Sequence, residues 1–115
     1  LDQAIINRFP DSMQLITVVR IGGLFQSTGL LGAYVGGEFR GITGPHDPIP
    51  LIPGWTYGGI TPYPFLTYGD EGEQFGFVFQ SDSGTTYNVV PDPMRIVSFE
   101  KDTSVGTYGS PLVLS

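Results

Sequence analysis

Few residues of this chain could perform acid–base or nucleophilic chemistry. A Ser-His-Asp triad would need His46, the single histidine, which stands in a proline-rich stretch. No serine has the Gly-x-Ser-x-Gly setting of a nucleophile elbow. Glycoside hydrolysis needs two carboxylates in contrasting environments, and none of the eleven acidic residues combines an apolar pocket with a partner. We therefore expect a protein that is not an enzyme.

Metal ligands are also scarce. A zinc site needs three or four His or Cys ligands, and the chain has one histidine and no cysteine. Asp70, Glu71 and Glu73 form the one acidic cluster, with Asp82 in a neighbouring turn. These four carboxylates are the calcium candidates, although their spacing matches no EF-hand or β-roll, and a solvated turn is the simpler interpretation. We expect no cofactor.

The best candidate surface is a group of four aromatic residues, Trp55, Tyr57, Tyr63 and Phe65. Three interpretations stay open. The rings could cover one open side of the fold as a lid. They could form a protein interface, because Trp and Tyr are enriched at interface centres. They could also present flat rings to a polysaccharide, since sugar-binding modules stack aromatic rings on pyranose faces.

A second candidate lies in the N-terminal arm, residues 1–12, which carries Ala4, Ile5, Ile6 and Phe9. The arm could pair with its own sheet as an edge strand. It could also leave its domain and add a strand to a neighbouring copy, which builds open-ended filaments when the rotation does not close. We expect this segment to be an assembly arm if the second alternative holds.

The charge balance excludes two classes of partner. The net charge is −6, with one lysine and four arginines. Nucleic acids and anionic membrane surfaces both require clustered cations, and no such cluster is present. No apolar run approaches the ~20 residues that span a bilayer, so we expect no membrane insertion.

The elements that must position these residues are short strands. Seventeen glycines and ten prolines disfavour helices, and apolar runs separated by turn residues recur along the chain. Residues 13–21 are apolar on both faces, which predicts a central strand covered on both sides. Gly22-Gly23 and Gly36-Gly37 predict tight hairpins. Phe75, Phe77 and Phe79 alternate with other residues, which predicts one buried strand face. Further strands are predicted at 24–27, 30–35, 38–42, 65–68, 85–89, 96–99 and 112–114.

These strands predict an all-β fold, an antiparallel two-sheet β-sandwich of jelly-roll or Ig-like type with about eight or nine strands. Residues 13–115 would form the single domain. Six of the ten prolines fall in an insertion at residues 43–64. Loops of this length are usually functional or disordered, so an individual function is most plausible there. Glu38 and Arg40 share a strand face and predict a surface ion pair.

The string LLGAYVGGEFRGI (residues 30–42) resembles a repeated module of secreted and cell-surface proteins of Bacteroidetes-like bacteria. The typical pattern there is "lGAFVgGecRGva" followed by "YGd..ge.i.F.lyd..tG..Y", often in proteins with a C-terminal sorting domain. The resemblance covers residues 13–115 with one gap, at the 43–64 insertion. It implies a β-sandwich, with turn glycines and core aromatics at matched positions. Those positions are Gly32, Gly36, Gly37, Gly41, Phe39, Phe77 and Tyr87.

From these observations we expect a non-catalytic extracellular or cell-surface module with a structural or adhesive role. It would associate with copies of itself or pack on neighbouring surface domains, as a filament subunit if strand addition operates. The alternative is a carbohydrate-binding module that uses the aromatic platform of Trp55, Tyr57 and Tyr63.

Overall fold

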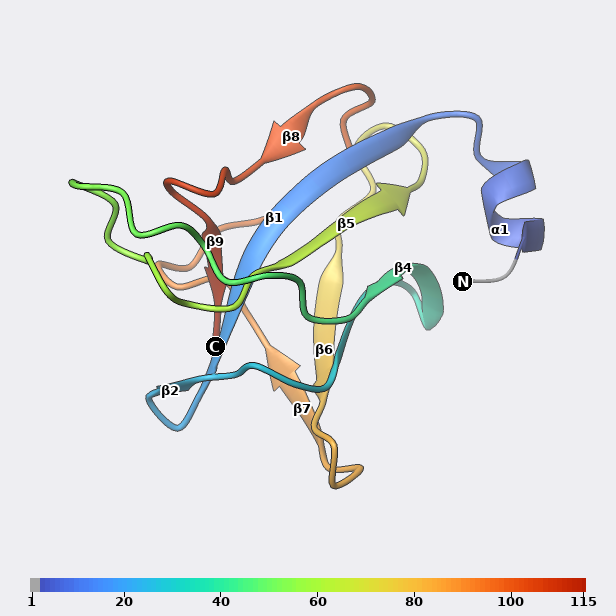
Figure 1. The fold of residues 1–115 in the computed structure, drawn as a ribbon. Helices are drawn as coiled ribbons and strands as arrows, with labels where there is room; N and C mark the ends of the chain where they lie inside the picture. The colour runs from blue at the N-terminus through green and yellow to red at the C-terminus, as the bar shows by residue number, and fades with distance from the viewer. Residues whose placement is uncertain (1–2) are drawn as a thin grey trace.

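A computed structural model, which describes residues 3–115, shows two β-sheets packed face to face (Figure 1). The prediction of an all-β two-sheet sandwich is confirmed. The elements in chain order are α1 (Gln3–Arg8), β1 (Ser12–Ile21), β2 (Leu24–Phe25), β3 (Leu30–Val35), β4 (Glu38–Thr43), β5 (Tyr63–Tyr68), β6 (Gly76–Gln80), β7 (Thr86–Val89), β8 (Ser104–Val105) and β9 (Leu112–Leu114).

The first sheet is built around β1, the long strand that crosses the middle of Figure 1. β1 pairs antiparallel with β2 and β5, and parallel with the short strands β8 and β9. Five successive residues of β1, from Leu15 to Val19, are buried. The prediction that this strand is central and covered on both faces is confirmed, since alternate side chains of a strand point to opposite faces.

The second sheet has the order β4-β3-β6-β7, and all its pairs are antiparallel. Phe77 and Phe79 of β6 point inward and are almost completely buried, as the alternation predicted. They meet the inward side chains of β1, β5 and β9 in one core between the sheets. Tyr63 packs edge-on against Phe79, with ring centroids 5.8 Å apart.

Both predicted glycine hairpins are present. Gly22 and Gly23 have φ angles of 59° and 81°, and Gly36 and Gly37 have 59° and 94°. Two successive residues with positive φ form the turn whose twist matches that of the flanking strands, and glycine adopts it without steric cost.

Three local predictions were wrong. Residues 3–8 form a helix and not an extended strand. Residues 96–99 are not a strand, because only Gln74 and Ser98 make a bridge there, although Val97 and Phe99 are buried in the core. The aromatic residues Phe39 and Tyr87, which the family resemblance placed in the core, are 43% and 37% exposed.

No helix among residues 3–115 is long and apolar enough to cross a membrane.

Candidate binding surface of the proline-rich insertion

The insertion between β4 and β5 is an ordered, irregular hairpin. Backbone hydrogen bonds join its two arms: His46 N–H donates to Pro62 (3.0 Å), Ile49 N–H donates to Ile60 (2.9 Å) and Gly59 N–H donates to Ile49 (2.7 Å). The bonds are few because prolines at many positions cannot donate one. In Figure 1 the hairpin extends to the side of the molecule opposite α1.

The hairpin is fastened to its own sheet by a second apolar cluster. Ile49 is 2% exposed and packs with Val18 of β1 and Val113 of β9. Four partly buried side chains pack around these three: Phe25, Trp55, Tyr57 and Ile60. The insertion therefore covers the outer face of the first sheet, which explains why β1 is buried on both sides.

The four aromatic residues predicted to share one surface are separated. Tyr63 is fully buried and Phe65 is 8% exposed, so their assignment to a binding surface was wrong. β5 begins at Tyr63, which pairs with Thr17 of β1, and the strand alternation turns residues 63, 65 and 67 into the core. Burial also raises the pKa of the Tyr63 phenol to about 12, and its hydroxyl donates a hydrogen bond to the Thr28 carbonyl (2.6 Å).

The other two rings lie on different parts of the insertion. Tyr57 packs edge-on against Phe25, with centroids 5.8 Å apart. Trp55 is half-buried and borders an open groove. Its indole lies against Gly109 so closely that a Cβ atom at Gly109 would come 3.0 Å from the ring. Of the four aromatic residues, only Trp55 therefore lines this groove.

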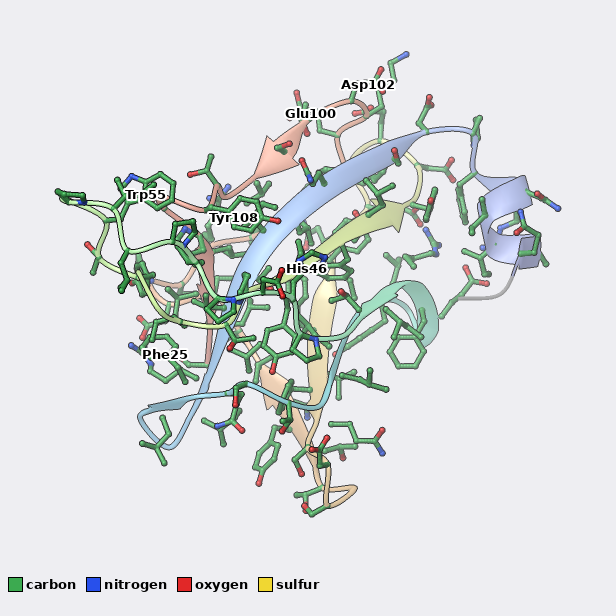
Figure 2. All side chains as sticks on the ribbon, viewed as in Figure 1. Phe25, His46, Trp55, Glu100, Asp102 and Tyr108 are labelled. Carbon is green, nitrogen blue, oxygen red and sulfur yellow. The ribbon has the colours of Figure 1, made fainter. Side chains whose placement is uncertain are left out.

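The groove beside Trp55 has a volume of about 300 Å³, and its walls come from two distant parts of the chain. The insertion supplies His46, Asp47, Pro48, Ile49, Pro50 and Trp55, and the loop before β9 supplies Tyr108. In the view of Figure 2, Tyr108 of the loop before β9 lies between Trp55 and His46 of the insertion. Sequence reasoning missed Tyr108, because its polar, glycine-rich surroundings resemble an ordinary connecting loop.

The outer end of the insertion carries exposed apolar side chains. Leu51 is 84% exposed and Ile52 is 41% exposed. No charged residue occurs between Asp47 and Asp70, so this end is also uncharged. We call Leu51 and Ile52 the insertion tip.

Residues 3–12 of the predicted assembly arm fold back on their own domain, and residues 1–2 lie outside the part of the chain that the structure describes. Phe9 is 5% exposed, and its ring lies between two guanidinium groups, 4.5 Å from that of Arg8 and 4.3 Å from that of Arg40. Arg8 also forms an ion pair with Glu38 at the start of β4. Ile5 and Ile6 are half-buried, and Ala4 is exposed. The arm is therefore held by Phe9 and Arg8, and its apolar run does not form an extended strand.

The predicted ion pair between Glu38 and Arg40 is present, but Arg40 is buried at the centre of a charge network and not exposed at the surface. Its guanidinium binds both carboxylate oxygens of Glu73 (2.7 and 3.1 Å) and Glu38 (2.7 Å). The register of β3 and β4 shifts at this point, so Phe39 faces Tyr34 and Gly41 faces Ala33. This bulge turns Arg40 inward, which β-bulges commonly do to a side chain.

The ion pairs shift the acidities of this network. The Arg40 guanidinium lowers the pKa of Glu73. The pKa of Glu38 is also lowered, mainly by its hydrogen bond with Arg8 and to a smaller extent by its hydrogen bond with Arg40. Hydrogen bonding to Glu73 raises the pKa of Arg40. All charges that face one another here are therefore compensated.

The four calcium candidates do not converge. The Glu73 carboxylate already accepts hydrogen bonds from the Arg40 guanidinium and from the backbone N–H of Asp70 (2.6 Å). Glu71 accepts the backbone N–H of Lys101 (2.8 Å), and Asp82 lies in the separate turn between β6 and β7. Within residues 3–115, no three His, Cys, Asp or Glu side chains gather as metal ligands would.

Comparison with known proteins gave no relative: no protein-family model, no curated protein and no solved structure matches the chain.

Proposed function

We propose that this protein is a non-catalytic structural or adhesive module that associates with copies of itself or packs on neighbouring surface domains. The observation that carries the proposal is the insertion tip, where Leu51 and Ile52 are exposed on an ordered, uncharged projection. Apolar side chains held away from the core by a rigid hairpin are typical of contact surfaces, because their burial against a partner removes apolar area from water.

The tip suits a contact because its support is already ordered. Ile49 fixes the base of the hairpin in the second apolar cluster, and the Gly59–Ile49 and Ile60–Tyr57 backbone hydrogen bonds (2.7 and 3.1 Å) brace the turn. A preformed loop loses less conformational entropy on binding than a mobile one. Burying two aliphatic side chains contributes about 3–5 kcal/mol before the cost of association, so we expect weak, concentration-dependent contacts.

A second exposed apolar face offers a receiving surface for such a contact. Leu30 is 50% exposed on β3, and Phe39 and Ile42 are each 43% exposed on β4. On the same face, Gly32 of β3 pairs with Ile42 of β4, and the Phe39 ring packs over Gly32. If the tip of one copy meets this face of another, the contact is heterologous and leaves both surfaces free at the ends, which permits open-ended assembly.

Strand addition by the N-terminal arm has less support than contact through the tip. The arm would have to unfold α1 and expose Phe9 before it could pair with a neighbouring sheet. An extracellular or cell-surface location is part of the proposal, and it is supported by the resemblance of residues 30–42 to secreted bacterial modules. Sugar binding through Trp55, Tyr57 and Tyr63 together has lost its support, because Tyr63 is buried and Tyr57 packs on Phe25.

The test is the molar mass of the full chain in solution from micromolar to millimolar concentration. We expect the mass to rise with concentration, and the double variant Leu51→Ser, Ile52→Ser to remain a monomer. Leu24→Ser is the matched control, since Leu24 is 72% exposed but lies at the β1–β2 hairpin. A monomer throughout, or equal assembly of the double variant and the wild type, would refute the proposal.

A further inference from the structure

We propose that the groove between Trp55 and Tyr108 binds a neutral oligosaccharide. This site differs from the insertion tip in its residues and in its ligand, so it adds a second activity to the contact function. The observation behind it is that two aromatic side chains and two polar side chains line one open depression: Trp55, Tyr108, His46 and Asp47.

The two rings are available for stacking. Close ring–ring contacts among the described residues join Phe25 to Tyr57, Tyr34 to Phe39, Tyr63 to Phe79 and Phe75 to Phe99, and neither Trp55 nor Tyr108 takes part in one. Tyr108 is 39% exposed. Aromatic faces carry partial negative charge, and the axial C–H groups of a pyranose carry partial positive charge, so sugar faces stack on such rings.

The Trp55 ring is also held in a fixed position. Its indole lies on Gly109, one residue after Tyr108. The Trp55 side chain also packs against the apolar cluster that contains Ile49. Gly109 has no side chain, so the indole can approach the loop that carries Tyr108. A rigid aromatic wall loses little entropy when a ligand binds, which favours affinity.

The polar side chains of the groove offer hydrogen-bond donors and acceptors, which a sugar can use and a hydrocarbon cannot. Within residues 3–115, the imidazole of His46, the carboxylate of Asp47 and the hydroxyl of Tyr108 form no hydrogen bond with another protein group. His46 and Asp47 are exposed to solvent at the groove. Their unmet donors and acceptors can therefore bond sugar hydroxyls, which fix the orientation of a ligand whose faces stack on the rings.

The charges of the site favour a neutral ligand. No lysine or arginine lines the groove, and Asp47 would repel a uronic acid or a sulfated sugar. The net charge of −6 acts in the same direction over a longer range.

The site has room for more than one sugar unit. His46, Asp47 and Pro48 also border a second depression, with a volume of about 640 Å³, which Ser27, Pro45 and Thr61 complete. The hydroxyls of Ser27 and Thr61 add hydrogen-bonding groups there. An oligosaccharide could thus stack one unit between Trp55 and Tyr108 and place the next beyond His46 (Figure 2).

The test uses Trp55 as its own probe, because it is the single tryptophan of the chain. The full chain is titrated with neutral hexasaccharides of glucose, mannose, xylose and N-acetylglucosamine, and with a hexauronate, while the emission wavelength is recorded. We expect a saturable shift with at least one neutral glycan and none with the hexauronate. Tyr108→Ala should weaken binding about five- to tenfold, as loss of one stacking ring does.

The control is Tyr87→Ala, which removes an aromatic side chain of similar exposure (37%) on β7, away from the groove. This variant should bind as the wild type does, and Asp47→Ala should bind more weakly. The proposal is overturned if no neutral glycan shifts the emission, if the hexauronate binds best, or if Tyr108→Ala and Tyr87→Ala behave alike. The solution mass of the Leu51→Ser, Ile52→Ser variant reports on self-association separately, so failure of one proposal leaves the other testable.

Discussion

The substitution Ile49→Ala tests whether the insertion is an integral part of the domain. Ile49 is 2% exposed and contacts Val18 and Val113, so its side chain joins the insertion to the central strand and to β9. The change removes three carbon atoms, which costs about 2.4 kcal/mol at ~0.8 kcal/mol per buried methylene. The cavity left behind adds to this cost. The cluster borders solvent and can partly collapse, so we expect a total loss of about 2.5–3.5 kcal/mol.

Urea unfolding at neutral pH measures this loss directly, and thermal unfolding should show a midpoint about 10 °C lower for a domain of this size. The loss should appear in the global transition, because Val18 belongs to the strand that holds the first sheet together. Amide hydrogen exchange gives a second readout at the Ile49 and Gly59 N–H groups, which bond across the hairpin. Both should exchange faster in the variant.

Leu51→Ala is the matched control, because Leu51 lies two residues away in the same segment and is 84% exposed. It should change the free energy of unfolding by less than about 0.5 kcal/mol. If Ile49→Ala were as mild as Leu51→Ala, the insertion would not be fastened to the sheet, and the arguments for a rigid tip and a preformed groove would both fail.

Two further predictions concern the rest of the domain. The Arg40 guanidinium lowers the pKa of Glu73, so the ionised carboxylate stabilises the fold. This contribution is present above the ordinary pKa of 4.5 and is lost as the pH falls through the lowered pKa of the folded state. Urea unfolding at a series of decreasing pH values should show that loss, and Arg40→Met should show a smaller one. Gly106→Ala should lower the free energy of unfolding by at least about 3 kcal/mol, because φ is 84° and the added Cβ would lie 2.3 Å from the Ile16 carbonyl oxygen. Gly84 has a similar φ of 88° but open space around it, so Gly84→Ala should lower the free energy of unfolding by about 1 kcal/mol. Equal costs for the two alanines would contradict the steric reasoning, and a flat pH profile would contradict the role of Glu73.

Local patterns in the sequence predicted the elements whose cause is local. The two glycine pairs specify tight hairpins because a positive φ is a property of the residue itself. The two-faced apolar run of β1 and the alternation at Phe77 and Phe79 specify burial because strand periodicity needs no knowledge of the partner strand. The six-residue helix was missed, since it is too short for its periodicity to stand out from the sequence.

The burial of Arg40 could not be read from its neighbours in the chain. Regular alternation places Glu38 and Arg40 together on one outer face, and a bulge between β3 and β4 changes that assignment. Glu73, which compensates the buried guanidinium, lies 33 residues further along the chain. Whether a strand contains a bulge depends on the pairing of two strands and on the ion pair that the bulge makes available.

The sequence by itself determined that this chain is a β-sandwich with hairpin turns, a central two-faced strand and a long proline-rich insertion. Only the tertiary structure decided which aromatic rings of that insertion are accessible. Tyr63 is buried because it pairs with Thr17, and Trp55 and Tyr108 line one groove because the insertion folds back over β1 and β9. Contacts between residues far apart in the chain depend on the packing of whole sheets, and no local pattern encodes that packing.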